Sequence, residues 1–312
     1  MSTIKVEDIA HVRFAAPDLA SMETFLREFG LTAVPSSDGM LYARGTGYQP
    51  FLHATSLGEP GFQALGLRAQ SVVDLEKLAA ADGATLEKFS APGGGYVVAL
   101  SDPDGFRVEV VAGQQPAAAL PLAQEPARNN ALAKTRLRAS TRLAAGPAHV
   151  VRLGHAVLEV KDFRASEAWY KSRFGFITSD EIEVAPGVAI GAFLRCDRGE
   201  LPTDHHTLFL LQSPGGAARF NHAAFEVADL DDLMLGHAHL KRAKRTPAWG
   251  IGRHILGSQI FDYWKDPWGH ELEHWTDGDL FTAADGSHKA TLQDLLAVQW
   301  GPNHPMTEGA AP

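Results

Sequence analysis

The stretch KDPWGHELEHW, residues 265–275, places an Asp-Pro-x-Gly turn directly before a run in which polar and apolar residues alternate. Such a turn followed by alternation predicts a strand that leaves a tight reversal of the chain. The stretch SDPDGFRVEVV, residues 101–111, repeats the same order of turn and strand. The recurrence indicates that the chain is built from two related halves.

The two halves also begin alike. IAHVRFAAPDL at 9–19 and LGHAVLEVKDF at 153–163 each predict an apolar strand that contains a histidine and is followed by a helix. Asp18 and Asp162 suit the caps of these helices, because a carboxylate accepts hydrogen bonds from the amides of a first helical turn. The same unit of strand and helix is therefore expected once at the start of each half.

Each half contains a second copy of this unit, FQALGLRA at 62–69 and FNHAAFEV at 220–227, again before a helical pattern. The chain thus predicts four similar units of strand, helix and several strands. This arrangement is an α+β fold of two domains, each made of two paired βαβββ modules.

Domain boundaries follow from the composition along the chain. Residues 1–112 form the expected N-terminal, non-catalytic domain, and residues 151–280 form the C-terminal, metal-binding domain. Residues 113–150 are rich in Ala, Pro, Arg and Gln without periodicity and are expected to connect the domains. Residues 281–312 form a C-terminal extension, in which a helix capped by Thr291 is predicted over 291–300 before a loose tail.

Composition excludes several classes of protein. The 312 residues are 45% hydrophobic and 21% charged, which is typical of a soluble globular protein. A net charge of −9 leaves no basic stripe for nucleic acid, and no apolar run approaches the roughly 18 residues of a membrane span. The start of the chain has no signal-peptide core, and the single cysteine, Cys196, has no internal disulfide partner. A cytoplasmic protein is expected.

Superposing the two halves singles out one set of polar residues. The second half carries His155, His222 and Glu273 at positions where the first half has His11, Ala64 and Glu109. Only the second set is complete, and two imidazoles with one carboxylate form the facial set that holds a redox-active divalent iron with open coordination positions. The alternative is that both histidines are hydrogen-bonded core residues and the glutamate is a solvated strand residue.

Alternation cannot choose between Glu271 and Glu273, because residues two apart share one face of a strand. The repeat chooses between them, since Arg107 stands opposite Glu271 and Glu109 stands opposite Glu273. His270 and His274 point to the other face and are expected at the surface or at an interface.

The stretch GRHILGSQIFDYWKDPWGHELE, 252–273, resembles the signature of the type I extradiol ring-cleavage dioxygenases, which belong to the vicinal oxygen chelate superfamily. The matching residues are Gly252, His254, Tyr263, Asp266, Pro267, Gly269 and Glu273. Asp262 departs from the pattern, which has an aliphatic residue or Phe before the tyrosine. The resemblance is specific over about 151–280 and implies the vicinal oxygen chelate fold.

The resemblance also implies roles for the site residues. His155, His222 and Glu273 would bind Fe(II), or Mn(II) as in some members of the family. His206, the second histidine of DHHTLFLL at 204–211, would be the acid–base residue. His254 and Tyr263 would hydrogen-bond the substrate oxygens. The implied reactants are a catechol and dioxygen, and a homo-oligomer is expected as in the family.

Elementary chemistry agrees with an acid–base role for one histidine of this segment. His205 and His206 are adjacent and would face opposite ways on a strand, so only one of them enters the pocket. An imidazole titrates near neutrality and can accept a proton from a catechol hydroxyl and return it.

Two other functions fit the same fold. A metal-dependent isomerase or lyase of the glyoxalase type would act without oxygen. A drug-sequestering protein would need no metal. The dioxygenase is the reading that uses all six residues, and it is the predicted function.

Overall fold

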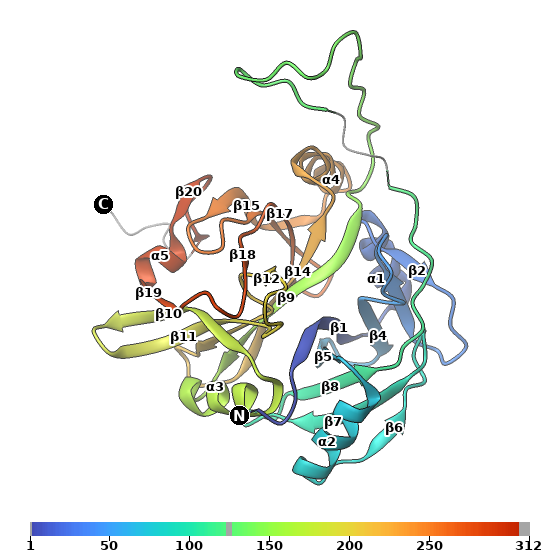
Figure 1. The fold of residues 1–312 in the computed structure, drawn as a ribbon. Helices are drawn as coiled ribbons and strands as arrows, with labels where there is room; N and C mark the ends of the chain where they lie inside the picture. The colour runs from blue at the N-terminus through green and yellow to red at the C-terminus, as the bar shows by residue number, and fades with distance from the viewer. Residues whose placement is uncertain (1, 123–126, 306–312) are drawn as a thin grey trace.

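Two large sheets, one for each half of the chain, form the architecture (Figure 1). The computed structural model describes residues 2–122 and 127–305. The predicted α+β class with repeated βαβββ modules is confirmed, because each sheet splits into two such modules.

The first sheet has the strand order β2-β3-β4-β1-β5-β8-β7-β6. β1 and β5 run antiparallel at its centre, and each pairs in parallel with the last strand of its own module, β4 or β8. Helix α1 (Leu19–Glu28) belongs to the first module and α2 (Val72–Asp82) to the second. The strands are β1 (Val6–Ala16), β2 (Thr32–Val34), β3 (Leu41–Arg44), β4 (His53–Leu57), β5 (Gly61–Ala69), β6 (Leu86–Lys88), β7 (Tyr96–Ser101) and β8 (Arg107–Ala112).

The second sheet repeats this plan with the order β19-β10-β11-β13-β9-β14-β17-β16-β15-β20. β9 and β14 take the central antiparallel places, and the modules carry helices α3 (Phe163–Phe174) and α4 (Leu230–Arg242). Its strands are β9 (Val150–Val160), β10 (Ile177–Ala185), β11 (Val188–Arg195), β13 (Leu208–Gln212), β14 (Arg219–Val227), β15 (Thr246–His254), β16 (Ile260–Lys265), β17 (Glu271–Thr276), β19 (His288–Thr291) and β20 (Val298–Trp300).

The C-terminal extension adds strands to this sheet instead of forming one long helix. α5 covers only Leu292–Leu296, with Thr291 in a capping box as expected, and β20 then pairs with β15. The prediction of a helix over 291–300 is therefore wrong in its second half, because Val298 and Trp300 complete the edge of the sheet. A two-stranded ladder joins β12 (Thr203–Asp204) to β18 (Leu280–Phe281).

The tail is partly ordered against the second sheet. The indole Nε1 of Trp249 donates to the carbonyl of Pro302 at 3.0 Å. The expectation of a loose tail is wrong for residues 301–305, and residues 306–312 lie outside the described part of the chain.

The caps and turns form as the sequence predicts. Asp18 accepts from the amides of Ala20 and Ser21, and Asp162 accepts from the amide of Ala165. These hydrogen bonds matter because the amides of a first helical turn have no carbonyl partners within the helix.

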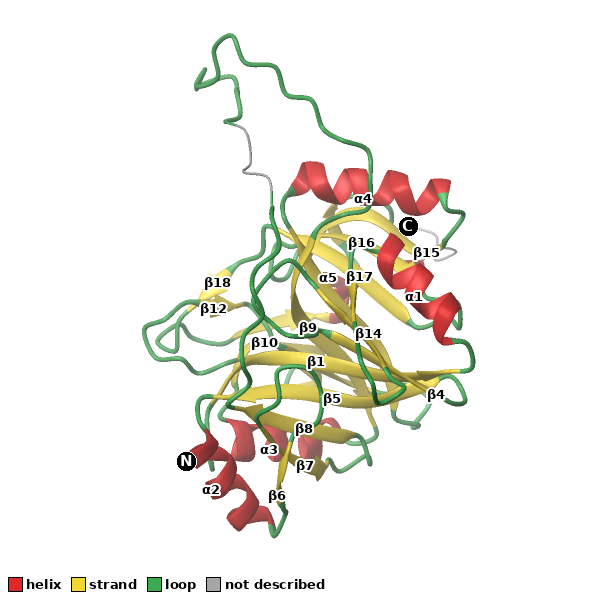
Figure 2. Ribbon diagram, turned by 90° about the vertical axis from the view of Figure 1, so that its right-hand side faces the viewer, coloured by secondary structure: helices red, strands yellow, loops and turns green. Residues whose placement is uncertain are grey.

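The two halves pack against each other through helices and buried rings. α1 lies beside α4, and an ion pair joins Arg173 at the end of α3 to Asp82 at the end of α2 (Figure 2). The ring of His274 donates from Nε2 to the carbonyl of Phe29 at 2.7 Å and stacks on the Phe29 ring at 3.8 Å. His270 contacts Phe14 of the first half at 5.0 Å between ring centroids, so both histidines lie at the junction of the halves.

The segment that joins the sheets projects away from both of them (Figure 1). Leu132 in this segment is fully exposed, and Leu137 is 82% exposed. We propose that each sheet with its helices is a domain, that residues 113–150 connect them, and that residues 281–312 extend the second. No helix within the described ranges is both long and apolar enough to cross a bilayer.

Asp266 stabilises the Asp-Pro-x-Gly turn at residues 266–269. Its Oδ1 accepts from the amides of Trp268 and His270 at 2.8 and 2.9 Å. We expect Asp266→Ala to lower the free energy of unfolding by about 1–3 kcal/mol, because two amides lose a partner in a partly buried turn. Urea denaturation measures the change, and Glu59→Ala on the surface is the control. Equal stability of the two variants would contradict this role of the turn.

Candidate metal centre

Three neighbouring strands at the centre of the second sheet carry the set that the comparison of the halves selected. His155 lies on β9, His222 on β14 and Glu273 on β17. Ala224 on β14 pairs with His155 on one side and with Glu273 on the other, and His222 precedes it by two residues on the same face. The three donor atoms lie within 4.8 Å of one another.

His155 and Glu273 are buried, His222 is partly buried, and donor atoms of His222 and Glu273 lack a hydrogen-bond partner among the described residues. Glu273 is completely buried, His155 is 2% exposed, and Nε2 of each histidine lies 3.3 Å from Glu273 Oε2. Among the described residues, none forms a hydrogen bond with His222 Nε2 or with either oxygen of Glu273. A buried carboxylate is costly unless a charge compensates it. Nitrogen and oxygen donors aimed at one point without partners fit a divalent metal ion.

Burial and charge set the protonation states that metal binding needs. Burial lowers the pKa of the His155 ring more than the nearby Glu273 carboxylate raises it, so the ring is neutral. Burial alone would raise the pKa of Glu273, but the approach of His155, His222 and His254 outweighs it and holds that pKa well below its usual range. Neutral imidazoles and an ionised carboxylate are the forms that donate lone pairs to a metal.

Asn221 orients the second histidine of the set. His222 Nδ1 lies 2.7 Å from Asn221 Oδ1, and an amide oxygen only accepts, so Nδ1 carries the proton and Nε2 keeps its lone pair. The Asn221 amide donates to Glu159 at 2.8 Å, and Arg219 binds the same carboxylate through two bonds of 2.7 Å. Such outer partners fix the ring of a ligand histidine. The sequence reasoning missed Asn221, although it directly precedes a candidate ligand.

A cavity of about 370 Å³ opens beside the set and is lined by both histidines. His206, His254 and Tyr263 also line it, so the cavity collects the three remaining candidate residues. One side of it is apolar and consists of Val157, Phe193, Phe209, Leu211, Leu256 and Leu295.

His254 and Tyr263 lie next to each other on β15 and β16. His254 Nε2 is 3.1 Å from the Tyr263 hydroxyl and 3.8 Å from Glu273 Oε1. Burial, with the negative charge of Glu273, raises the pKa of Tyr263 well above its ordinary value. The phenol therefore stays protonated and can donate to an oxygen in the cavity.

The ring of His206 lies beside that of His155, one of the three candidate ligands. Its ring centroid is 3.9 Å from that of His155, and burial lowers its pKa well below the ordinary value for histidine. His205 and His206 lie between β12 and β13, not within a strand, and their Nδ1 atoms are 3.1 Å apart. The expectation that the two rings diverge across a strand is therefore wrong, although only His206 lines the cavity.

The first half satisfies the matching glutamate with a side chain of its own. Glu109 accepts from His11 at 2.8 Å and from Arg13 at 2.7 Å. The second half has Val157 at the position of Arg13, and this valine lines the cavity. In the first half the guanidinium of Arg13 therefore supplies positive charge beside the glutamate. The second half has a valine at this position, and we expect a metal ion to supply the charge there.

Asp262, the departure from the family signature, is a buried carboxylate paired by hydrogen bonds. Asp262 is completely buried, lies 3.1 Å from His237 Nδ1 of α4 and accepts from the Trp264 indole at 2.6 Å. The pair ties α4 to β16, the strand that carries Tyr263. The polar residue at this position is therefore satisfied and leaves the cavity side of the strand unchanged.

The C-terminal extension closes part of the cavity. His304 and Pro305 line it, and the ring of His304 contacts Trp249 at 4.6 Å between centroids. The side chain of Gln299 donates to the carbonyl of His254 at 2.9 Å. This wall could not be predicted from the sequence, because it depends on the pairing of β20 with β15.

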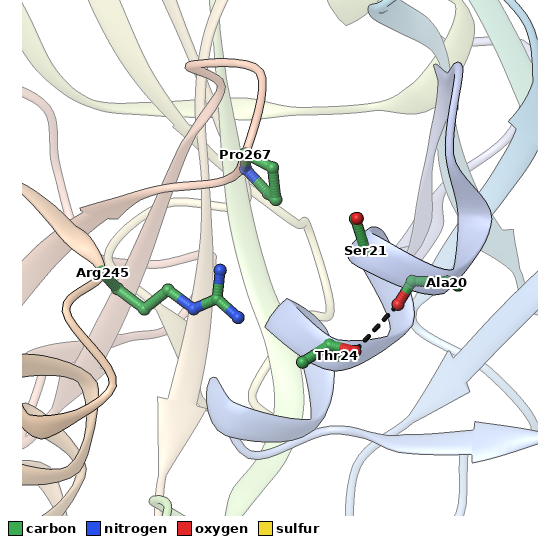
Figure 3. Close-up of a pocket in the computed structure, with 5 residues that line it drawn as sticks. All are labelled: Ala20, Ser21, Thr24, Arg245 and Pro267. Carbon is green, nitrogen blue, oxygen red and sulfur yellow. Dashed lines mark hydrogen bonds between the residues drawn. The ribbon is translucent and has the colours of Figure 1, made fainter.

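A second hollow of about 310 Å³ lies between the halves, beside α1 and Pro267 (Figure 3). Arg245 faces it and is paired with Glu28, and Thr24 donates to the carbonyl of Ala20 at 2.9 Å. Its polar groups are satisfied, so chemistry is not expected there.

The sequence of the chain is similar to those of several known proteins. The family model described as Glyoxalase/Bleomycin resistance protein/Dioxygenase superfamily matches residues 152–274. Metapyrocatechase 2 of Cupriavidus necator is 29% identical over 303 residues, which cover 96% of this chain and 90% of that protein. An iron-dependent extradiol dioxygenase of Rhodococcus jostii is 30% identical over 138 residues, or 40% of this chain and 43% of that protein.

A solved structure shows the same fold. The Mn(II)-bound glyoxalase from Novosphingobium aromaticivorans superposes with a TM-score of 0.78 at 23% identity, covering 97% of this chain and 94% of that one. The candidate ligands His155, His222 and Glu273 thus lie in the part of the chain that matches this superfamily, and nearly the whole chain is similar to a metapyrocatechase.

Glu273 and Glu271 provide a matched test of the proposed ligand set. Glu271 lines the cavity and lies 3.6 Å from Lys265, two residues from Glu273 on the same strand. We expect Glu273→Gln to weaken iron binding by more than the about 10- to 100-fold loss typical of outer-shell changes, because it removes a direct ligand and its charge. Glu271→Gln should retain iron. Metal analysis after dialysis against a weak chelator measures both, and the reverse order would contradict the assignment.

Proposed function

We propose that the protein cleaves a catechol ring between a hydroxylated carbon and its non-hydroxylated neighbour. Both atoms of one dioxygen enter the ring-opened product, so no external reductant is consumed. The observation that carries this proposal is the convergence of His155, His222 and Glu273, with the Glu273 oxygens unpartnered among the described residues, beside a cavity lined by His206, His254 and Tyr263.

We assign Fe(II) as the bound ion and Mn(II) as the alternative, because both accept two imidazoles and one carboxylate. The iron-dependent relative supports the first choice. A divalent iron held there would lower the pKa of the catechol hydroxyls and supply the redox capacity for reaction with dioxygen.

His206 is proposed as the residue that moves protons. A neutral imidazole beside the His155 ring can accept a proton from a catechol hydroxyl and later return it to an oxygen of the opening ring. Its low pKa supports this order, because the ring starts without the extra proton.

His254 and Tyr263 are proposed to hold the substrate oxygens. The Tyr263 phenol remains protonated and can donate, and His254 Nε2 lies 3.1 Å from its oxygen and 3.8 Å from Glu273 Oε1. Donors placed in advance stabilise negative charge as it develops on oxygen, and they do so most strongly where water is excluded.

The lining of the cavity favours one kind of catechol. Among the described residues that line it, the Arg and Lys side chains are already paired, Arg219 with Glu159 and Lys265 with Glu271. A carboxylate on the substrate would lack a free cation, whereas an alkyl, halogen or aryl substituent can contact Phe193, Phe209 and the other members of the apolar side.

Neither alternative function accounts for all six candidate residues of the site. A glyoxalase-type isomerase needs no dioxygen, and the full-length sequence likeness is to a metapyrocatechase. A binding protein without a metal would keep the buried carboxylate of Glu273 without a hydrogen-bond partner beside the two histidines that line the cavity.

We also propose that the protein assembles from copies of itself and resides in the cytoplasm. The fully exposed Leu132 of the projecting connector supports the first proposal, and a single buried cysteine supports the second. Size-exclusion chromatography with light scattering tests the assembly, and a monomer at micromolar concentration would contradict it.

An oxygen electrode tests the reaction and the role of His206. We expect the iron-loaded protein to consume one dioxygen per catechol with the appearance of a yellow product. His206→Asn should reduce kcat by about 100- to 10,000-fold, as for loss of an acid–base group, while iron content is retained. His288→Asn is the control. Turnover without oxygen uptake would favour the isomerase, and unchanged kcat in His206→Asn would remove His206 from its role.

A substrate panel tests the lining of the cavity. We expect kcat/KM for 3-methylcatechol to exceed that for 3,4-dihydroxyphenylacetate by at least about tenfold, since a buried carboxylate without a partner costs more than 1.4 kcal/mol. Equal values for the two catechols would contradict the proposed preference.

A further inference from the structure

A chain of hydrogen bonds leads away from His206 on the side opposite the cavity. His205 Nδ1 lies 3.1 Å from His206 Nδ1, and His205 Nε2 lies 2.6 Å from Asp180 Oδ2 on β10. All three residues are buried. Neither His205 nor Asp180 lines the cavity within the part of the chain that the structure describes.

The protonation chemistry of these side chains determines which atom donates in each of these hydrogen bonds. An ionised carboxylate only accepts, so Nε2 of His205 carries a proton and donates it to Asp180. A neutral imidazole has one N–H, which leaves Nδ1 of His205 as an acceptor. Nδ1 of His206 must then be the donor, because two lone pairs 3.1 Å apart would repel each other. Nε2 of His206 is the nitrogen that remains unprotonated.

We infer that Asp180 and His205 fix the tautomer of His206, so that its unprotonated Nε2 faces the cavity as the base. Asp180 and His205 are positioning residues, and the catalytic part of the inference rests on the proposed function. A base with the opposite tautomer would present an N–H to the catechol and could not accept its proton.

The surrounding chain holds His205 in this orientation. Its backbone carbonyl accepts from Ser179 Oγ at 2.6 Å, and its amide donates to the carbonyl of Asp279 at 3.0 Å. Arg195 donates to Ser179 Oγ at 2.9 Å and to the carbonyl of Thr178 at 2.8 Å. These bonds fix the backbone from which the ring of His205 extends, and the bond from Nε2 to Asp180 fixes the ring itself, so His205 is suited to orient its neighbour.

His288, which lies beyond Asp180 from His206, supplies a control residue. His288 on β19 lies opposite Asp180 in the sheet, with Nδ1 3.9 Å from Asp180 Oδ1, and its side chain is 70% exposed. At that distance it does not direct the carboxylate, which is already bonded to His205. His288→Asn should therefore leave the tautomer of His206 as it is.

The tautomer is measured by nitrogen NMR on the full chain labelled with ¹⁵N-histidine and loaded with diamagnetic Zn(II). The His206 signals are assigned by their loss in His206→Gln. We expect His206 protonated on Nδ1 and His205 protonated on Nε2. A His206 ring protonated on Nε2, or a doubly protonated His205, overturns the inference whether or not the protein cleaves catechols.

Asp180→Asn should reverse the donors and acceptors of these hydrogen bonds with little change of shape. An amide can donate to His205 Nε2 and so shift the proton of His205 to Nδ1. His206 should then be protonated on Nε2, and kcat for the preferred catechol should fall by about 10- to 100-fold with KM changed less than about twofold. An unchanged tautomer with unchanged kcat contradicts the inference.

Substitutions of His205 separate orientation from packing. His205→Leu removes the acceptor and should lower kcat as Asp180→Asn does. His205→Asn places an amide oxygen near the position of Nδ1 and should restore both the Nδ1–H tautomer of His206 and most of kcat. Equal losses in the Leu and Asn variants, with equal melting temperatures, would contradict the assigned role. If the parent protein does not cleave catechols, the NMR tautomers still decide the inference and only the proposed function fails.

Discussion

A carboxylate buried between two imidazoles, with no hydrogen-bond partner among the described residues, is the constraint on which the rest of the site depends. Glu273 is completely buried between two imidazoles, and its oxygens have no hydrogen-bond partner among the described residues. The cost of such a group exceeds what ordinary packing recovers, so the arrangement makes sense when a cation joins it. The paired modules place this carboxylate and its two histidine neighbours beside the cavity. The proposed chemistry follows from that placement.

The internal repeat shows a second solution to the same constraint. In the first half Glu109 is met by His11 and by the guanidinium of Arg13, which closes the site with a covalently attached charge. In the second half Val157 replaces Arg13, and the space beside the strands becomes a cavity. One architecture therefore yields a closed structural pair in one half and an open site in the other, through few substitutions on equivalent strands.

The fold and the donor set could be predicted because their signals are local and repeated. The Asp-Pro-x-Gly turns, the Asp18 and Asp162 caps and the alternation of the strands each specify a short segment, and the repeat supplies the comparison. The contact of His205 with His206 could not be predicted, since it depends on a bend between β12 and β13. The wall that includes His304 depends in the same way on a pairing of the sheet edge with residues about 45 positions away in the sequence.

The central claim is that one ion joins His155, His222 and Glu273 in the second half of the chain, and not the matching residues of the first. The most direct measurement is an anomalous difference map, recorded at the iron edge from crystals of the iron-loaded protein grown without oxygen. The account predicts a single strong peak among these three side chains and none beside Glu109. A peak elsewhere, or the same density at both glutamates, would contradict it.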